Sequence, residues 1–238
     1  MVRDMTTTLV TGATRGIGRE VVAQLVAAGH EVLLGARDRA AGDRAAAAIG
    51  AEVVELDVTD DASVARAAQM VRRRGGLDVL VNNAGVPGHA CDATEIDAAT
   101  IRAVFETNVF GVVRTMHAFA GLLRASAQPV VVNVSSGLGS IAAAVDPDAH
   151  VDTVPVWVPA LHYGASKAAL NMLTVQYARA CPWMRINAVD PGFTATDFND
   201  HRGTRSVADA ARVVVDLATI GFDGPTATFT GDHGTVPW

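Results

Sequence analysis

The chain has 238 residues, half of them hydrophobic, and a formal net charge of −6. Such a length can bury a sizeable core, so we expect one domain over residues 1–238. The acidic balance argues against nucleic acid as a partner, because nucleic-acid binding rests on clustered positive charge. Of the 19 basic residues, only Lys167 is a lysine.

The expected cellular location follows from three features: the N-terminal stretch, the longest uncharged stretch and the cysteines. Asp4 interrupts the N-terminal stretch where an export signal would have a basic start and an apolar run, so no export is expected. The longest uncharged stretch, residues 125–145, contains polar residues and glycines and is expected to be a buried strand and a loop, with no membrane partner. Cys91 and Cys181 form no disulfide framework and suit a reducing cytosol. We therefore expect a cytoplasmic protein.

Short β-branched runs alternate along the chain with alanine-rich helical runs. This alternation predicts an α/β protein with a doubly wound parallel sheet of about seven strands and helices on both faces. The expected strands are residues 7–11, 31–35, 52–56, 79–82, 130–134, 186–189 and 226–230. The expected helices are residues 18–28, 62–73, 100–124, 165–180 and 207–219.

Three glycines, Gly12, Gly16 and Gly18, stand where the first strand ends and the first helix begins. Glycines at such a turn let backbone N–H groups approach a pyrophosphate, and the helix N-terminus attracts the same anion. The first gap is longer than in the commoner dinucleotide fingerprint. The motif predicts a dinucleotide site, with an ordinary strand-to-helix turn as the alternative.

The end of the second strand bears on the choice between NAD and NADP. An acidic residue there would hold the free 2′-hydroxyl of NAD, but this strand ends in Gly35-Ala36-Arg37. A second arginine, Arg15, lies inside the glycine motif. Two guanidinium groups can bind a 2′-phosphate bidentately, so the pair favours NADP(H). The alternative is that both are solvated surface arginines.

Tyr163 and Lys167 are four residues apart and therefore neighbours on one helix face. A nearby ammonium stabilises a phenolate, so Lys167 is predicted to lower the pKa of Tyr163 toward neutral pH. The phenol could then act as a general acid or base. The alternative is a chance pair on a solvated helix face.

Seven motifs stand in order along the chain: Thr11-Gly12-x-x-x-Gly16-Ile17-Gly18, Leu56-Asp57-Val58, Asn82-Asn83-Ala84-Gly85, Asn108, Val134-Ser135-Ser136, Tyr163-x-x-x-Lys167 and Asn187-Ala188-Val189-Asp190-Pro191-Gly192-x-x-x-Thr196. Together they resemble the short-chain dehydrogenase/reductase family, of the single-domain, carbonyl-reductase-like type. The resemblance covers nearly the whole chain and implies a Rossmann-type fold with a nicotinamide cofactor.

The resemblance implies four catalytic residues. Ser136 would hydrogen-bond the substrate carbonyl oxygen, with Ser135 as its rival, while Tyr163 delivers the proton. Lys167 would hold the nicotinamide ribose and lower the Tyr163 pKa. Asn108 would anchor a water that passes protons to Lys167.

The resemblance also implies a cofactor site. Asp57 would contact the adenine, and Asn82 with the turn that follows it would line the cleft. Thr196 with the Pro191-Gly192 turn would meet the nicotinamide amide and the phosphates. The expected cofactor-binding residues are Gly12, Thr14, Arg15, Gly16, Ile17, Gly18, Arg37, Asp57, Val58, Asn83, Ala84, Gly85, Asn108, Tyr163, Lys167, Pro191, Gly192, Thr194 and Thr196.

Taken singly, some of these residues also have structural interpretations. Asn82 and Asn83 could cap a strand-end turn, and Asn108 could bend a helix. Asp57 could cap the helix that begins near Asp60. Their occurrence together around one cleft favours the functional interpretation.

Residues 137–162 resemble the insertion of carbonyl-reductase-like members, which can cover a dimerisation face, so both a monomer and a homodimer remain open. The apolar residues near Trp157, among them valines flanked by prolines, are expected to pack the loop, with a role in the pocket wall as the alternative. Residues 193–205 are expected to form a substrate lid. His162 is expected in a loop, and no metal is expected, because His89 and Cys91 lack further ligands at suitable spacing.

The sequence therefore predicts an enzyme that transfers a hydride from NADPH to a ketone or aldehyde, with a small carbonyl or alcohol compound as substrate. Reduction is the expected direction, because cells usually keep this cofactor reduced. One alternative is a regulatory protein that senses NADP(H) without chemistry, which would not need Ser136, Tyr163, Lys167 and Asn108. The other is an NAD-dependent alcohol dehydrogenase working oxidatively, against which Arg37 argues.

Overall fold

The computed structural model describes residues 5–89 and 92–238, and a single sheet runs through them. Its strand order is β3-β2-β1-β4-β5-β6-β7-β8. The strands are β1 (Thr7–Val10), β2 (Glu31–Ala36), β3 (Glu52–Glu55), β4 (Val79–Asn82), β5 (Val130–Val134), β6 (Arg185–Asp190), β7 (Phe229–Gly231) and β8 (Gly234–Thr235). Strands β1 to β7 pair in parallel and β8 pairs antiparallel with β7, which confirms the predicted doubly wound, Rossmann-type fold.

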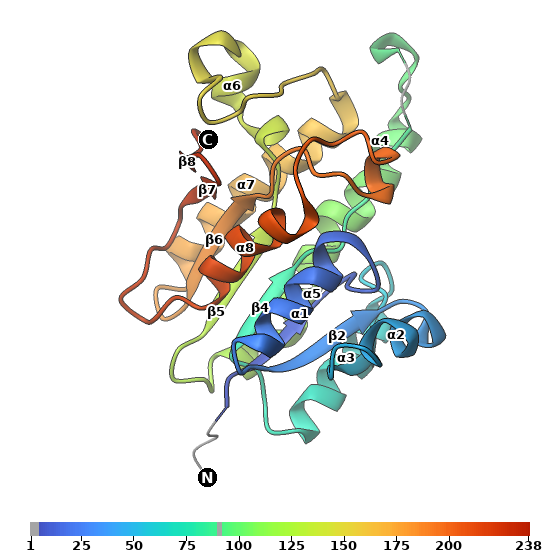
Figure 1. The fold of residues 1–238 in the computed structure, drawn as a ribbon, viewed down its shortest axis with the longest axis vertical. Coiled ribbons are helices and arrows are strands. Elements are labelled where there is room, and N and C mark those ends of the chain that lie inside the picture. Colours follow the sequence, from blue (N-terminus) through green and yellow to red (C-terminus); the bar gives the residue numbers. More distant parts are fainter. Residues whose placement is uncertain (1–4, 90–91) are drawn as a thin grey trace.

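Helices cover both faces of the sheet (Figure 1). One face carries α1 (Gly16–Ala27), α2 (Arg39–Ala46) and α8 (Val207–Ala218), and the other carries α3 (Asp61–Arg73), α5 (Gly111–Leu123) and α7 (Leu161–Ala180). Successive side chains of a strand point to opposite faces, so Val81 of β4 packs in the first layer and Leu80 in the second. Both are fully buried, which is why the strands are apolar without alternation.

The remaining short elements are η1 (Ala93–Glu95), α4 (Ala98–Phe105), the π-turn η2 (Glu106–Phe110), η3 (Gly137–Gly139), α6 (Ile141–Val145), η4 (Asp148–His150) and η5 (Asp197–Asn199). Figure 1 shows α4 and α6 at the upper end of the molecule, beyond the carboxyl ends of the parallel strands. The strand order reverses between β1 and β4, where α/β sheets place their ligands.

Three of the expected elements differ from the structure, and one helix is additional. The single helix expected over residues 100–124 is α4, a π-turn and α5 in succession. Helix α2 was not expected; it has only eight residues, with Gly42 in its middle. Helix α7 begins at Leu161, before the expected residue 165, so His162 lies in its first turn and is buried; its expected place in a loop is wrong. The last parallel strand covers only Phe229–Gly231.

A chain of buried amides and hydroxyls fixes α5 and α7 against the sheet. Asn82 of β4 donates to Asn133 of β5 at 2.8 Å, and Asn133 donates to Thr174 of α7 at 2.9 Å. Thr115 of α5 donates to the Asn82 side-chain oxygen at 2.8 Å. Buried polar groups are costly unless they are paired, so this chain specifies the register of β4, β5 and α7. Helix α7 carries the predicted catalytic pair, whose place is thereby set.

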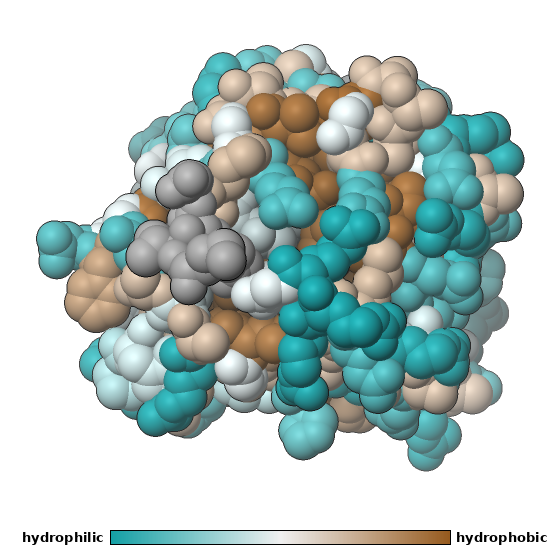
Figure 2. Space-filling model, turned by 90° about the horizontal axis from the view of Figure 1, so that it is seen from below, coloured by the Kyte–Doolittle hydropathy of each residue, from teal (hydrophilic) through white to brown (hydrophobic). Residues whose placement is uncertain are grey.

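Two observations describe the surface: the character of the helices and the hydropathy of one face. Over the described part of the chain, no helix has both the length and the apolar character needed to cross a membrane. The face seen from below in Figure 2 is mixed, with hydrophilic residues surrounding areas where hydrophobic residues reach the surface.

Candidate active site

A cavity of about 1740 Å³ opens at the carboxyl ends of the strands. With Asn108 as the exception, all predicted catalytic and cofactor-binding residues line it: Gly12, Thr14, Arg15, Gly16, Ile17, Gly18, Arg37, Asp57, Val58, Asn83, Ala84, Gly85, Ser136, Tyr163, Lys167, Pro191, Gly192, Thr194 and Thr196. The expectation that Asn82 lines the cleft is wrong, because its amide is buried and donates to Asn133 between the strands.

The glycine motif and the turn after β4 form one cradle. Gly12 has φ +63°, and a Cβ there would stand 2.8 Å from the Cα of Ala84. The Thr11 hydroxyl accepts the N–H groups of Asn83 and Ala84 at 3.0 Å each, and the Asn83 amide donates to the Thr11 carbonyl at 2.8 Å. Helix α1 begins at Gly16, and no side chain caps its first N–H groups. An uncapped helix N-terminus behind a backbone cradle fits the pyrophosphate of a dinucleotide.

The predicted phosphate-binding arginines lie at the two sides of this cradle. Arg37 is exposed directly after β2, and Arg15 is exposed in the glycine motif, where it pairs with Asp197 at 3.2 Å. The next acidic residue after Arg37 is Asp38, whose carboxylate accepts the Ala41 N–H at 2.8 Å and so caps α2. Asp38, the acidic residue nearest to the end of β2, therefore serves as the N-cap of α2.

Asp57 lies in the adenine region that the resemblance implies. Burial acts to raise its pKa, but the Thr59 hydroxyl and backbone N–H, with Arg37 and Arg114, outweigh burial and hold the pKa below its usual value. Its carboxylate bonds to Thr59 at 2.7 and 2.9 Å. The alternative of a helix cap at Asp57 is wrong, because Asp60 caps α3.

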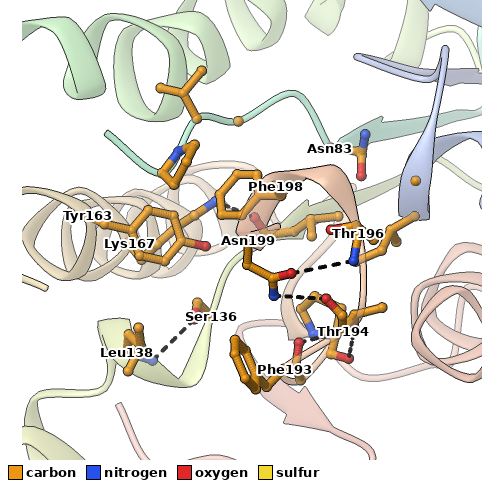
Figure 3. Close-up of a pocket in the computed structure, with 18 of the residues that line it drawn as sticks. Asn83, Ser136, Leu138, Tyr163, Lys167, Phe193, Thr194, Thr196, Phe198 and Asn199 are labelled. Carbon is orange, nitrogen blue, oxygen red and sulfur yellow. Dashed lines mark hydrogen bonds between the residues drawn. The ribbon is translucent and has the colours of Figure 1, made fainter. Parts of the chain in front are cut away.

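Tyr163 and Lys167 stand one turn apart on α7 and face the same cavity (Figure 3). The Lys167 side chain is only 4% exposed, and its ammonium donates to the Val134 carbonyl at 2.8 Å. The Lys167 Nζ lies 5.6 Å from the centre of the Tyr163 ring, over its face. The ammonium is therefore held at the end of β5, above the phenol ring.

Burial dominates the acidity of both groups. It raises the pKa of the Tyr163 phenol above its usual range; the Ser136 side chain acts against this effect, and the charge of Asp190 adds to it. Burial lowers the pKa of Lys167 to about 8, although the Asp190 charge acts to raise it. The predicted lowering of the Tyr163 pKa is therefore wrong in this structure, because burial of the phenol raises its pKa.

The two candidate serines have different surroundings. Ser135 is 2% exposed and donates to the Asn171 side chain at 2.6 Å, so its hydroxyl is committed to α7. The Ser136 hydroxyl accepts the Leu138 N–H at 3.2 Å and interacts with Tyr163, beneath which it lies in Figure 3. The geometry favours Ser136 over Ser135 as the hydroxyl that faces a ligand.

Asn108 lies in the π-turn between α4 and α5 and is 1% exposed. Its amide accepts the Val86 N–H at 2.9 Å and donates to the Val86 carbonyl and the Ser166 hydroxyl, both at 3.0 Å. It thus joins the turn after β4 to α7. π-Turns inside helices are frequent at functional sites, and this one interrupts a helix that the sequence pattern predicted to be continuous.

Two features of the site were missed by the sequence analysis. Phe198 meets the Tyr163 ring edge-on, with 5.6 Å between ring centres. The second feature is the close contact at Gly139. A Cβ at this position would stand 2.7 Å from the backbone of Lys167, so the turn after Ser136 packs directly on α7. A glycine pair around a leucine is a weak sequence signal, and no local pattern identifies Phe198.

Residues 193–205 and the segment around Trp157 both contribute to the cavity wall. Residues 193–205, the expected lid, close at their base, where the Ala195 N–H donates to the Arg205 carbonyl at 3.0 Å. Val156 and Val158 line the cavity and are 44% and 51% exposed, so the expectation that these valines pack the loop is wrong for them. Trp157 between them packs against the buried cluster that includes Phe229 and Val236.

His89 and Cys91 are the two metal-ligating side chains that stand close together in the sequence after the Asn82-Asn83-Ala84-Gly85 turn. No group of three or more metal-ligating side chains occurs among residues 5–89 and 92–238. Cys91, half of the pair considered above, lies outside the described residues.

A parallel sheet with a dinucleotide cradle beside a buried tyrosine–lysine pair defines a nicotinamide-dependent oxidoreductase. The family model for short chain dehydrogenase matches residues 6–206. "Short-chain dehydrogenase anuI" of Penicillium roqueforti is 35% identical over 225 residues, covering 90% of this chain and 88% of that protein. (−)-Isopiperitenone reductase of Mentha piperita is 34% identical over 298 aligned positions, covering 93% and 94%. The chain belongs to the short-chain dehydrogenase family.

Solved structures agree with this assignment. The NADPH-bound carbonyl reductase from chicken fatty liver superimposes with a TM-score of 0.84 and 28% identity, covering 98% of this chain and 99% of that one. Salutaridine reductase from Papaver somniferum superimposes with a TM-score of 0.83 and 26% identity, covering 95% and 99%.

Proposed function

We propose that this oxidoreductase reduces a ketone or aldehyde with NADPH. The observation that carries the proposal is that Ser136, Tyr163 and Lys167 share one cavity with the glycine cradle and with Arg15 and Arg37. A sensor of NADP(H) performs no proton transfer to a substrate, so it has no use for the hydroxyls of Ser136 and Tyr163 at this place. Reductase-named relatives in the same family support the direction.

The choice of NADP(H) rests on the two arginines. Arg15 and Arg37 would hold the 2′-phosphate, and Asp38, the acid that could otherwise favour NAD, is engaged in capping α2. The cradle of Gly12, Gly16 and the turn after Asn83 would hold the pyrophosphate. When bound, the cofactor supplies the hydride.

The chain's own residues would supply orientation and a proton. Ser136 would position the substrate oxygen by a hydrogen bond. Tyr163, whose raised pKa keeps the phenol protonated at neutral pH, would donate its proton to that oxygen. Lys167 would hold the nicotinamide ribose hydroxyls with its ammonium, and Asn108 would anchor a water on the proton path to Lys167.

Five exposed apolar side chains lie on the substrate side of the cavity. Phe193, Phe198, Val156, Val158 and Leu161 line it and are 39–51% exposed. Contact with such side chains is favourable for an apolar compound by about 25 cal/mol per Å² of buried area. We therefore propose a carbonyl compound with a bulky hydrocarbon body.

The test is consumption of NADPH with a panel of alkyl, cyclic and aromatic ketones, aldehydes and quinones, followed by absorbance. We expect turnover with at least one apolar carbonyl and a clear preference for NADPH over NADH. Tight binding of NADPH with no turnover across the panel would favour the sensor. Faster oxidation of alcohols with NAD would favour the alcohol dehydrogenase.

A further inference from the structure

Asp190 is a buried carboxylate to which the proposed mechanism gives no role. It ends β6 directly before the Pro191-Gly192 turn, is 9% exposed, and lines the same cavity as Tyr163 and Lys167. An aspartate is rarely buried unless hydrogen bonds and opposite charges compensate it. The groups that compensate Asp190 therefore indicate what it does.

Two turns of the active site meet at this carboxylate. Oδ1 accepts the N–H of Gly192 at 3.0 Å. Oδ2 lies 2.9 Å from the point where a Cβ on Gly137 would stand, and the Gly137 N–H also bonds to the carboxylate. Gly137 directly follows Ser136, so the carboxylate joins the turn that presents the Ser136 hydroxyl to the turn after β6. The side-chain amide of an asparagine has only one acceptor oxygen for these two donors.

Titratable groups from three elements face Asp190. Tyr163 and Lys167 face it from α7, Arg205 from the segment before α8, and His233 from the turn between β7 and β8. Burial raises the pKa of Asp190, and the two backbone N–H groups, Arg205 and His233 act against this effect.

Arg205 does not cancel the charge of Asp190 by itself. Its Nη2 lies 2.8 Å from a carboxylate oxygen of Asp232 and donates to the Asp209 carbonyl at 2.8 Å. The positive charge of Arg205 is thus shared with Asp232. Asp190 and Lys167 line the same cavity, and the Asp190 charge acts to raise the pKa of Lys167 against the effect of burial.

We propose that Asp190 is a positioning residue of the active site, whose carboxylate joins the Ser136 turn to the Pro191-Gly192 turn and supports the Lys167 ammonium with a negative charge. This inference rests on the proposed reductase function for its catalytic meaning. Asp190 acts through Ser136 and Lys167 and needs no contact with the substrate.

The sole lysine of the chain makes a direct test possible. Protein labelled with ¹³C and ¹⁵N at lysine gives one side-chain signal, that of Lys167, and its titration midpoint can be followed by NMR in the wild-type chain and in Asp190→Asn. We expect the midpoint to fall by about one pH unit in Asp190→Asn, because removing a nearby negative charge favours the neutral amine. Asp216→Asn, which removes a carboxylate from the exposed face of α8, is the matched control and should leave the midpoint unchanged.

Circular dichroism and a thermal melt establish that the variant is folded. If Asp190→Asn does not fold, Asp190→Ser removes the same charge with a smaller side chain. A folded variant with the wild-type Lys167 midpoint overturns the proposal, since a merely structural role would change stability without moving a lysine titration.

The pH dependence of kcat/KM separates this inference from the proposed function. With an active substrate, the alkaline limb of kcat/KM in Asp190→Asn should move to lower pH, because both Lys167 and Tyr163 lose their protons more easily without the carboxylate. A decrease in kcat/KM with an unmoved limb counts against the proposal. A wild-type chain that reduces no carbonyl overturns the proposed function, whereas the NMR titration still decides the charge coupling.

Discussion

The ammonium of Lys167 donates to the Val134 carbonyl at 2.8 Å, which places the only lysine of the chain at the end of β5, 5.6 Å from the centre of the Tyr163 ring. A guanidinium is planar and larger, and it does not present a compact point charge at this position. The arrangement gives a physical reason why lysine is retained here in a chain that otherwise uses arginine. It also makes the protonation of Lys167 a measurable property of the site.

The first prediction concerns pH. The pKa of Lys167 is lowered to about 8, so the ammonium that would hold the cofactor ribose is lost as pH rises through that value. We expect kcat/KM to be level below about pH 7 and to decline above about pH 8. Its profile with NADPH, measured across this range, checks the sign; activity that rises through pH 8 would contradict the assignment.

The second prediction separates the two serines. Ser136→Ala should lower kcat at least tenfold with little change in thermal stability, because its hydroxyl faces the cavity. Ser135→Ala should cost about 1–3 kcal/mol of unfolding free energy, because it leaves the buried Asn171 amide without its 2.6 Å partner. Parallel denaturation and kinetic measurements distinguish the two effects. The reverse pattern would transfer the catalytic role to Ser135.

The third prediction concerns cofactor choice. Arg37→Ala should weaken NADPH binding about tenfold or more and leave NADH binding nearly unchanged, since a hydrogen bond to a charged group contributes about 1.5–3 kcal/mol. Arg39→Ala is the matched control, because Arg39 pairs with Asp43 at 3.0 Å and does not line the cavity. Fluorescence titrations with both cofactors supply the measurement. Equal losses for NADPH and NADH in Arg37→Ala would refute the 2′-phosphate role.

The fourth prediction addresses the apolar wall. Phe198→Ala should raise KM for a bulky hydrophobic carbonyl by about threefold to tenfold while preserving the fold, because the ring is 39% exposed at the cavity. Phe222→Ala removes a similarly exposed ring that stacks under Arg185, away from the cavity, and serves as the control. An unchanged KM across the ketone series would exclude Phe198 from the substrate side.

Much of the sheet and the cofactor cradle could be predicted from sequence because their signals are local. Buried parallel strands are apolar without alternation, and the glycine motif directly follows the first strand. A bend of the helix at Asn108 was open from the sequence, but its form as a π-helix could not be predicted, since it depends on bonds to Val86 and Ser166, which are remote in the chain. The raised pKa of Tyr163 could not be predicted either, because it depends on how deeply the fold buries the phenol. Spacing placed Lys167 beside the phenol, but the fold directs the ammonium to Val134 and buries both groups.

The most direct test of the central claim is Tyr163→Phe, which removes one oxygen and keeps the ring that packs on Phe198. NADPH consumption with the best carbonyl of the panel and NADPH affinity are measured in the same preparation. We expect turnover to fall by at least about 100-fold while NADPH binds nearly as in the wild type. Wild-type turnover in this variant would contradict Tyr163 as the proton donor.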